Sequence, residues 1–557
     1  MTKNFFTLAV AGLGSAGICQ SLSIANVCTV SYVRSALPAN GTLGNIIINA
    51  SSATASAVYN SSFSGNVFYP DAVLDYCNVT FAYSHEGKSD RVLVEYWMPA
   101  PSAYQNRYLA TGGMAYAING GSSWLPSGVQ VGAVAGLTDG GFGSFDTSFD
   151  TAFLLANGTI NYDALFMMGY RAIGETTLIG KAFSKGFYGL STDQKVYTYY
   201  QGCSEGGREG WSQVQRWGDV YDGVMPGAPA IRYGQQQAKH LYSNAVEKTL
   251  DYYPPSCELE KIVNETIAAC DSLDGRSDGV VSRTDLYQLN FNISSIIGTS
   301  YACAASSGGG IGLGFGKMKR QFGGGSSTPA QNGTVSAEGV AVAQTILAGL
   351  HDANGDRVYI SYQPSASFSD AATTYDSDTD SSTLDIASTG GEWVVRFLEL
   401  TSASNLASLD NVTYDTLKSW MIQGMTTYMD TLQTTLPDLT PFYNNGGKIL
   451  TIRGESDPSI PTGSYVHYHE SVRSTMYSNM TFNASSEALG DWYRLFLVPG
   501  AAHCATNDAQ ANGPFPQTTL QTLIDWVENG VKPALLNATH LQGDYEGESD
   551  QLCAWPL

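Results

Sequence analysis

The chain has 557 residues, 43% of them hydrophobic, so it can bury a large core and exceeds the length of one average domain. Its 28 basic and 50 acidic residues give a formal net charge of -22. Phosphate binding needs concentrated lysine and arginine, so this balance argues against nucleic acid and anionic membranes as partners. We interpret the length as one α/β catalytic domain with an insertion.

The first 20 residues are typical of a secretory signal peptide, because Lys3 precedes an apolar stretch, 5–13, and several small residues. A buried N-terminal helix is the alternative. Once Cys19 is removed with this leader, eight cysteines remain, an even number that suits disulfides in an oxidising compartment. Twelve N-x-[ST] sequons also favour a secreted glycoprotein, and no later segment is long and apolar enough to span a bilayer.

Strands and helices alternate over the first part of the mature chain. Segments 75–83 and 90–98 predict a strand pair, and 107–110 predicts the next strand. A helix over 163–186, a strand over 195–200 and helical spacing over 209–221 follow. This alternation predicts a mostly parallel sheet.

The stretch 201–210, QGCSEGGREG, predicts a strand-to-helix turn that presents a serine. Gly202, Ser204 and Gly206 fill the G-x-S-x-G frame of a nucleophile elbow, in which small residues let strand and helix pass closely. Ser204 is therefore the candidate nucleophile. An ordinary glycine-rich turn is the alternative, and Cys203 is the weaker candidate because the frame is centred on Ser204.

Such a nucleophile needs backbone amides that bind the oxyanion formed during ester cleavage. In esterases of the α/β-hydrolase type, a glycine loop after an early strand supplies one amide and the residue after the nucleophile supplies the other. We predict Gly113, less firmly Gly112, together with Glu205. A plain turn between strand and helix explains the two glycines almost as well.

The alternation is interrupted over 232–401, which predicts an inserted lid domain. Segment 270–280, CDSLDGRSDGV, is rich in aspartate and glycine. Calcium binds carboxylate and carbonyl oxygens on tightly curled loops, so Asp271, Asp274 and Asp278 are candidate side-chain ligands, with carbonyl oxygens from Arg276 and Val280. From residue chemistry alone, a solvated acidic turn explains the segment equally well.

The lid also contains a glycine-rich, low-complexity segment, 306–328, with Lys319-Arg320 in its middle. A dibasic pair in an accessible loop is a target for a processing protease, so we predict a nick there. An uncut surface loop is the alternative.

Two strand-to-loop units after the lid carry candidate partners for Ser204. A predicted strand near 447–453 precedes Asp457, with Glu455 as the competing carboxylate, and a strand near 492–500 precedes His503. The chain order Ser, Asp, His is that of α/β-hydrolases. If Ser204 and His503 meet, their neighbours Cys203 and Cys504 come within reach of a disulfide.

Several long segments resemble the tannase and feruloyl esterase family of fungi, whose signature places cysteines beside the catalytic serine and histidine. Here that signature is Cys203-Ser204, Asp457 and His503-Cys504. The resemblance covers nearly the whole mature chain. The segments GFYGLSTDQKVYTYYQGCSEGGREGWSQVQRWG, TLDYYPPSCELEKIV, GESDPSIP and LVPGAAHC are more similar to the tannase branch than to the feruloyl esterase branch.

The resemblance implies an α/β-hydrolase domain over 21–231 and 402–557, with the lid between. It implies a structural calcium ion in the lid at positions matching Asp271, Asp274, Arg276, Asp278 and Val280, and a Cys28–Cys77 disulfide. The implied activity is hydrolysis of galloyl esters and depsides of hydrolysable tannins, which are small phenolic esters, through a Ser-His-Asp triad and an acyl-enzyme. The resemblance predicts no oligomeric state.

The chain departs from the family's cysteine pattern in two places, and two alternative functions remain open. Tyr287 stands where the resemblance predicts a lid cysteine, and the chain stops soon after Cys553, so the pairing of Cys257, Cys270, Cys303 and Cys553 is open and Cys553 is a candidate free thiol. A feruloyl or chlorogenate esterase on the same scaffold is the nearest alternative. A non-catalytic binding protein with the esterase fold is a third.

Overall fold

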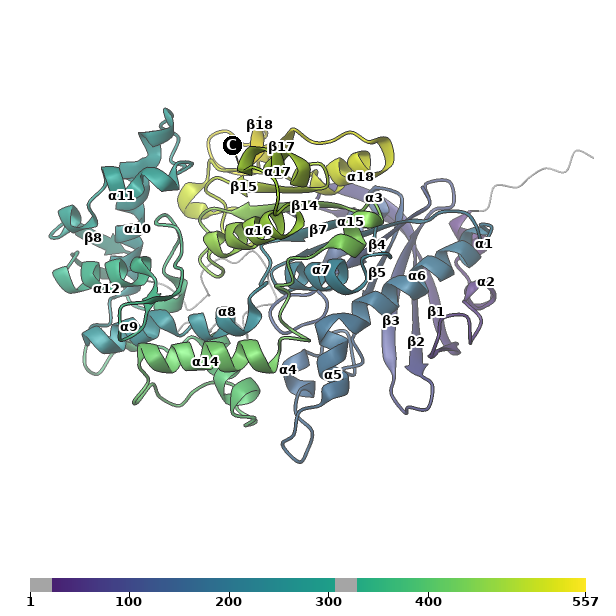
Figure 1. Cartoon of the computed structure of the whole chain (residues 1–557), viewed down its shortest axis with the longest axis horizontal. Helices are drawn as coiled ribbons and strands as arrows, with labels where there is room; N and C mark the ends of the chain where they lie inside the picture. The colour runs from purple at the N-terminus through teal and green to yellow at the C-terminus, as the bar shows by residue number, and fades with distance from the viewer. Residues whose placement is uncertain (1–22, 306–327, 557) are drawn as a thin grey trace, which may run out of the picture.

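The computed structural model describes residues 23–305 and 328–556, and a twelve-stranded sheet forms the centre of this described part (Figure 1). The predicted signal segment 1–20 and the Lys319-Arg320 pair lie outside the described residues. The strand order is β1-β2-β3-β5-β4-β6-β7-β14-β15-β18-β17-β16. The strands are β1 (Ile46–Phe63), β2 (Ala72–His85), β3 (Val92–Pro99), β4 (Arg107–Thr111), β5 (Ala133–Thr138), β6 (Tyr197–Cys203), β7 (Gly223–Gly227), β14 (Lys448–Gly454), β15 (Tyr493–Val498), β16 (Pro514–Phe515), β17 (Leu535–His540) and β18 (Ser549–Trp555).

The middle of the sheet is parallel, as predicted, from β5 through β4, β6, β7 and β14 to β15. Antiparallel strands extend it on both sides. Residues alternate between the two faces: Tyr108 and Ala110 of β4 belong to one apolar cluster, whereas Leu109 belongs to another. All three side chains are buried, because helices cover both faces of a parallel sheet.

Helices α6 (Ala172–Tyr188) and α7 (Glu205–Arg216) cover one face of the sheet, whereas α3 (Pro126–Gln130) and α18 (Thr519–Asn529) cover the other. Gly180 of α6 lies directly against Tyr108, and Gly128 of α3 lies against Leu109 on the opposite side. Shorter or peripheral helices complete the core: α1 (Ile24–Val27), α2 (Val30–Ala36), α4 (Phe149–Ala152), α5 (Tyr162–Phe166), α15 (Thr440–Asn444), α16 (Thr462–Met476) and α17 (Phe482–Leu489).

Two helical segments and one strand differ from the sequence expectations. The helix after the serine begins at Glu205 rather than at 209, and a π-helical segment, Met167–Arg171, separates α5 from α6. Strand β1 was not predicted. Its outer half is rich in small and polar residues and largely exposed, so its pairing with β2 rather than its own pattern determines it.

The predicted insertion 232–401 folds beside the sheet and contributes no strand to it within the described residues (Figure 1). It contains helices α8 (Tyr233–Lys239), α9 (Tyr242–Leu250), α10 (Ser256–Cys270), α11 (Tyr287–Asn290), α12 (Ala337–Ala348) and α13 (Ser388–Glu392). Its hairpins pair β8 (Ser300–Cys303) with β9 (Gln331–Thr334), β10 (Leu350–His351) with β11 (Arg357–Tyr359), and β12 (Thr373–Asp376) with β13 (Ser381–Leu384). Helix α14 (Tyr414–Thr427), which follows the predicted boundary at 401, packs against α8 on this side.

Three disulfides join the described residues: Cys28–Cys77, Cys203–Cys504 and Cys257–Cys303. The first two confirm the expected pairs, and the third joins α10 to β8 within the lid. Of the open set, Cys270 is buried and unpaired, and Cys553 is an exposed free thiol. Among the helices in the described ranges, none has the length and apolarity that crossing a bilayer requires.

Candidate active site

Ser204 is the single residue between β6 and α7, and its backbone is strained. Its φ of 65° and ψ of -120° lie in a region that residues with a side chain rarely adopt. The flanking glycines permit this turn, since a Cβ on Gly206 would lie 2.8 Å from the Gly113 carbonyl oxygen. A Cβ on Gly202 would lie 2.8 Å from the backbone of Gly206. The G-x-S-x-G frame therefore forms an elbow that presents the serine hydroxyl.

The three residues predicted as a triad meet in one hydrogen-bonded chain. The Nε2 atom of His503 lies 2.8 Å from the Oγ atom of Ser204, and its Nδ1 atom lies 2.8 Å from Oδ2 of Asp457. Asp457 follows β14, and His503 follows β15, the next strand in the sheet. Because the carboxyl ends of β6, β14 and β15 lie at one edge of the sheet, residues about 300 positions apart converge there.

The Asp457 carboxylate is buried and fully engaged. Its Oδ1 atom accepts the amides of Ser459 and Ile460, each at 2.9 Å. Burial alone would raise the pKa of Asp457, but the charges of His503 and Arg453 overcome that effect and hold the pKa at about 2. The carboxylate is therefore ionised at neutral pH and fixes the proton on Nδ1 of His503.

The competing carboxylate, Glu455, does not share this position. Its side chain makes no hydrogen bond to His503 in the described structure, and burial raises its pKa to about 8. The Cys203–Cys504 disulfide adds a covalent link beside the pair, joining the residue before Ser204 to the residue after His503.

Ser204 opens into a pocket between the catalytic core and the predicted lid. The loop after β4 contributes Ala115 and Tyr116, the elbow contributes Ser204 and Glu205, and helix α8 forms a wall on the lid side. The lining residues are Ala115, Tyr116, Ser204, Glu205, Ala230, Tyr233, Gln236, Gln237, His240, Thr389, Ser459 and Ile460.

The structure corrects the prediction for the first oxyanion amide. The Gly113 amide donates to Oε2 of Glu209 at 2.8 Å, and the Gly112 amide donates to the Gln201 carbonyl at 3.2 Å. Neither amide is free to bind an oxyanion, although Glu205 does line the pocket beside Ser204.

Ala115, two residues further on, fits the role that Gly113 does not. It lies at the tip of a tight turn, because the amides and carbonyls of Met114 and Ala117 bond to each other at 3.1 and 2.8 Å. Its φ is 50°, it lines the pocket, and its amide donates no hydrogen bond within the described ranges. Sequence analysis does not identify Ala115, because its role depends on this turn and the sequence contains no recognisable motif for the turn.

The predicted calcium ligands lie on one curled loop of the lid. Asp271 accepts the amides of Asp278 and Gly279, at 2.9 and 2.8 Å, and Asp274 accepts the Ser282 hydroxyl at 2.6 Å. Burial, followed by the charges of Asp271 and Asp274, raises the pKa of Asp278. Over the described residues, no three His, Cys, Asp or Glu side chains are arranged closely enough to hold a metal ion. The donor types suit calcium, and the calcium site stays a prediction.

Comparison with known proteins shows the family to which this fold and site belong. Residues 77–557 match the family model described as Tannase and feruloyl esterase. The chain belongs to this tannase and feruloyl esterase family. It is 55% identical to the Tannase of Aspergillus oryzae over 99% of this chain and 93% of the relative. It is 29% identical to a Probable feruloyl esterase of Arthroderma benhamiae, over 88% of this chain and 83% of the relative.

Solved structures agree with this family membership. The Tannin acyl hydrolase from Aspergillus niger superposes with a TM-score of 0.91 at 57% identity, covering 96% of this chain and 93% of the other. Feruloyl esterase B from Aspergillus oryzae, at 21% identity, superposes with a TM-score of 0.65 over 92% and 93% of the two chains and shows the shared fold. This member of the tannase and feruloyl esterase family thus has the α/β-hydrolase fold, and it is a hydrolase of carboxylic esters.

Proposed function

We propose that this esterase hydrolyses galloyl esters and the depside bonds of hydrolysable tannins, releasing gallic acid. The observation that carries the chemistry is the hydrogen-bonded chain from Ser204 through His503 to Asp457 at a pocket. The substrate class is supported by the high identity to relatives named Tannase and Tannin acyl hydrolase.

The geometry supports a serine esterase mechanism. His503 takes the proton from Ser204 Oγ as the oxygen attacks the ester carbonyl, and Asp457 stabilises the resulting imidazolium. The amides of Ala115 and Glu205 bind the oxyanion of the tetrahedral intermediate. His503 then protonates the leaving alcohol, and a water molecule activated by His503 hydrolyses the acyl-enzyme.

The wall formed by α8 suits a phenolic ring. Gln236 is buried, and its Oε1 atom has no hydrogen-bond partner within the described structure, so it offers an acceptor to a phenolic hydroxyl. His240 lies beside it in the pocket, and its Nδ1 atom is already held by Asp370 at 2.9 Å. Polar groups beside the ring of Tyr233 in this pocket favour hydroxylated aromatic acids.

A feruloyl or chlorogenate esterase is the second candidate, because relatives on this scaffold are named as feruloyl esterases. We also propose that the enzyme is secreted and glycosylated, on the N-terminal pattern and the sequons. In the lid, calcium would be held by Asp271, Asp274 and Asp278 with the carbonyls of Arg276 and Val280. The ion would neutralise these carboxylates and stiffen the loop.

Turnover of methyl gallate and methyl ferulate, compared for the wild type and Ser204→Ala, tests this proposal. We expect a higher kcat/KM on methyl gallate and a loss of kcat on the order of 10⁴-fold or more in Ser204→Ala. Ser474→Ala, an exposed helical position far from the motif, is the matched control and keeps full activity. Preference for methyl ferulate would transfer the assignment to the feruloyl esterases. Activity that survives in Ser204→Ala would overturn the nucleophile.

A further inference from the structure

Glu209 is a fully buried carboxyl group outside the set of residues that line the pocket, and the mechanism described above does not use it. It lies on α7, the helix that begins directly after the nucleophile. Its Oε2 atom accepts the Gly113 amide at 2.8 Å and lies 3.2 Å from the hydroxyl of Tyr200. That hydroxyl donates to the Gly206 carbonyl at 2.5 Å. Glu209 therefore joins the loop after β4 to the elbow.

A second bond closes the same junction. The Gly206 amide donates to the Gly113 carbonyl at 3.0 Å, so both polar backbone groups of Gly113 are held by the elbow helix. The packing leaves no slack: a Cβ on Gly112 would lie 1.9 Å from the Tyr200 hydroxyl and 2.6 Å from Oε2 of Glu209. The loop thus has one position relative to the elbow, and its next turn carries Ala115 into the pocket.

We infer that Glu209 is a positioning residue that places the Ala115 amide for oxyanion binding. Oxyanion donors act only when they lie about 2.7–3.1 Å from the developing charge, and a displacement of about 1 Å costs on the order of 10²-fold in rate. Glu209 controls that distance because it holds Gly113, two residues before Ala115. The inference rests on the proposed function, since an oxyanion forms only if Ser204 attacks an ester.

Burial, followed by the charge of Glu205, raises the pKa of Glu209 well above its ordinary value and so favours the neutral acid. The contact to Gly113 needs only an acceptor oxygen, because Oε2 of Glu209 accepts the Gly113 amide. The side-chain amide oxygen of a glutamine, which has the same length as glutamate, would accept the Gly113 backbone amide equally well. The length of the side chain, rather than its acidity, is then the property that positions the loop.

Two substitutions separate length from acidity. Glu209→Gln keeps the length of the side chain and removes the carboxyl group. Glu209→Asp keeps the carboxyl group and shortens the side chain by one methylene. On methyl gallate we expect Glu209→Gln to retain most of kcat, and Glu209→Asp to lose about 10- to 100-fold in kcat with KM within about twofold of the wild type.

A transition-state probe makes the test independent of turnover. An arylboronic acid forms a tetrahedral adduct with the serine, whereas gallic acid binds without one. We expect the inhibition constant of the boronic acid to rise about 10- to 100-fold in Glu209→Asp, and that of gallic acid to stay constant. Circular dichroism and melting temperature verify that each variant is folded. If Glu209→Asp does not fold, Tyr200→Phe, which removes the hydroxyl that links Glu209 to Gly206, takes its place with a smaller expected loss.

The outcomes separate the inference from the function on which it rests. Wild-type turnover that disappears in Ser204→Ala supports the proposed function whatever Glu209 does. A wild-type kcat in folded Glu209→Asp, or a larger loss in Glu209→Gln than in Glu209→Asp, would then overturn the positioning role alone. A wild type inactive on both esters would overturn the proposed function and this inference together.

Discussion

Arg453 is the charged residue that, after His503, keeps the triad acid ionised. It is fully buried at the end of β14, where its Nη1 atom lies 3.4 Å from Oδ2 of Asp457 and its Nη2 atom donates to the Ile460 carbonyl. Ile460 in turn donates its amide to Asp457, so Arg453 supports both the charge of the carboxylate and the turn that carries it. Sequence reasoning did not single out this residue.

Arg453→Met is expected to shift the loss of stability at low pH upward by about one pH unit. The folded-state pKa of Asp457, about 2, is below its ordinary value of about 3.9, so the carboxylate is stabilised above pH 4 and its contribution is lost as pH falls towards 2. Removing a cation reduces this depression. Melting temperatures between pH 2 and 5 measure the shift, with Arg453→Lys as the control that keeps the charge. A low-pH stability profile that is unchanged in Arg453→Met would contradict the role.

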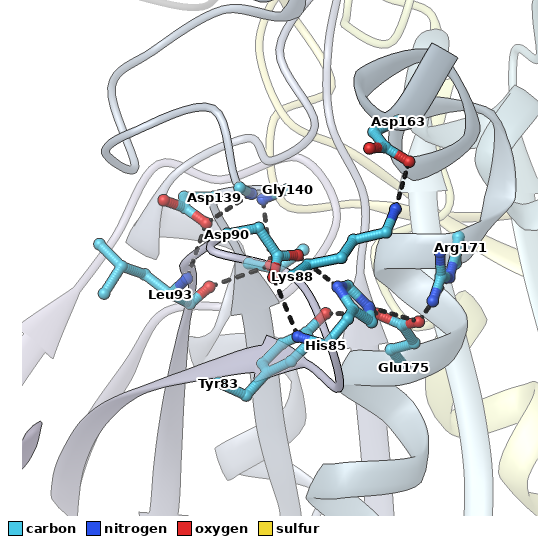
Figure 2. A network of polar contacts seen from close by, with 12 residues as sticks. Tyr83, His85, Lys88, Asp90, Leu93, Asp139, Gly140, Asp163, Arg171 and Glu175 are labelled. Atoms are coloured by element: carbon cyan, nitrogen blue, oxygen red, sulfur yellow. Dashed lines mark hydrogen bonds and ion pairs between the residues drawn. The ribbon is translucent and has the colours of Figure 1, made fainter. Parts of the chain in front are cut away.

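At the scale of elements, a buried histidine joins the β2–β3 hairpin to α6 (Figure 2). The Nε2 atom of His85 lies 2.9 Å from Glu175 of α6, and its Nδ1 atom bonds to Asp90 of the hairpin. Glu175 also accepts from Tyr83, at 2.7 Å, and from Arg171, at 2.7 Å. With carboxylates on both ring nitrogens, the doubly protonated imidazolium satisfies the network best.

This network predicts a pH-dependent contribution to stability. The hydrogen bond to Glu175, opposed by burial and reinforced by Asp90, raises the pKa of His85. A raised pKa stabilises the fold fully below about pH 6.5, and that stability is lost as pH rises through the folded-state value. His85→Gln is therefore expected to lower the melting temperature most near pH 5.5, by the equivalent of about 1–3 kcal/mol, and progressively less towards pH 9.

The neighbouring surface pair supplies the control for this experiment. Lys88 contacts Asp163 in the same view, but both side chains are exposed (Figure 2). Asp163→Asn should change the melting temperature little at any pH, because exposed pairs contribute about 0–1 kcal/mol. A gap between wild type and His85→Gln that is the same at pH 5.5 and pH 9 would rule out the ionic contribution.

At the scale of the whole molecule, the acidic loop of the lid is connected to the catalytic core. Gln510 is buried, accepts the Val281 amide at 2.8 Å and donates to the hydroxyl of Ser456 at 2.6 Å. Ser456 directly precedes the triad acid Asp457. A second contact to the loop comes from Asn512, whose side chain donates to the Asp278 carbonyl at 2.8 Å. The loop proposed to bind calcium thus contacts the segment that follows His503, and Gln510 of that segment connects it to the segment that carries the triad acid.

Calcium removal is therefore expected to affect the whole molecule. Treatment with EGTA should lower the melting temperature, and added calcium should restore it, because a bound ion stabilises only the folded loop. Asp274→Asn should reduce this response, whereas Asp415→Asn, an acid outside the loop, should retain it. Melting temperatures of wild type that do not change with EGTA or calcium would exclude the metal site.

The local parts of the fold could be predicted from the sequence. Strands near β4, β6, β14 and β15 have hydrophobic runs long enough to be recognised. The single disulfide that links the neighbours of Ser204 and His503 follows from the position of the cysteines in the motif. Strand β1 could not be predicted in this way, because its weakly apolar pattern becomes a strand only by pairing with β2. The start of α7 was placed four residues late, because glycines in its first turn hide the helical pattern.

The elbow, the order of serine, acid and histidine, and the alternating core can be predicted from residue types alone, because they depend on short, regular spacings. Which backbone amide is left without an acceptor beside the pocket depends on contacts between distant segments. Gly113 is bound to a carboxyl group 96 residues later in the chain, and this contact leaves Ala115 as the free donor. A backbone amide is chemically the same at every such position, so its role depends on which acceptor the folded chain brings to it.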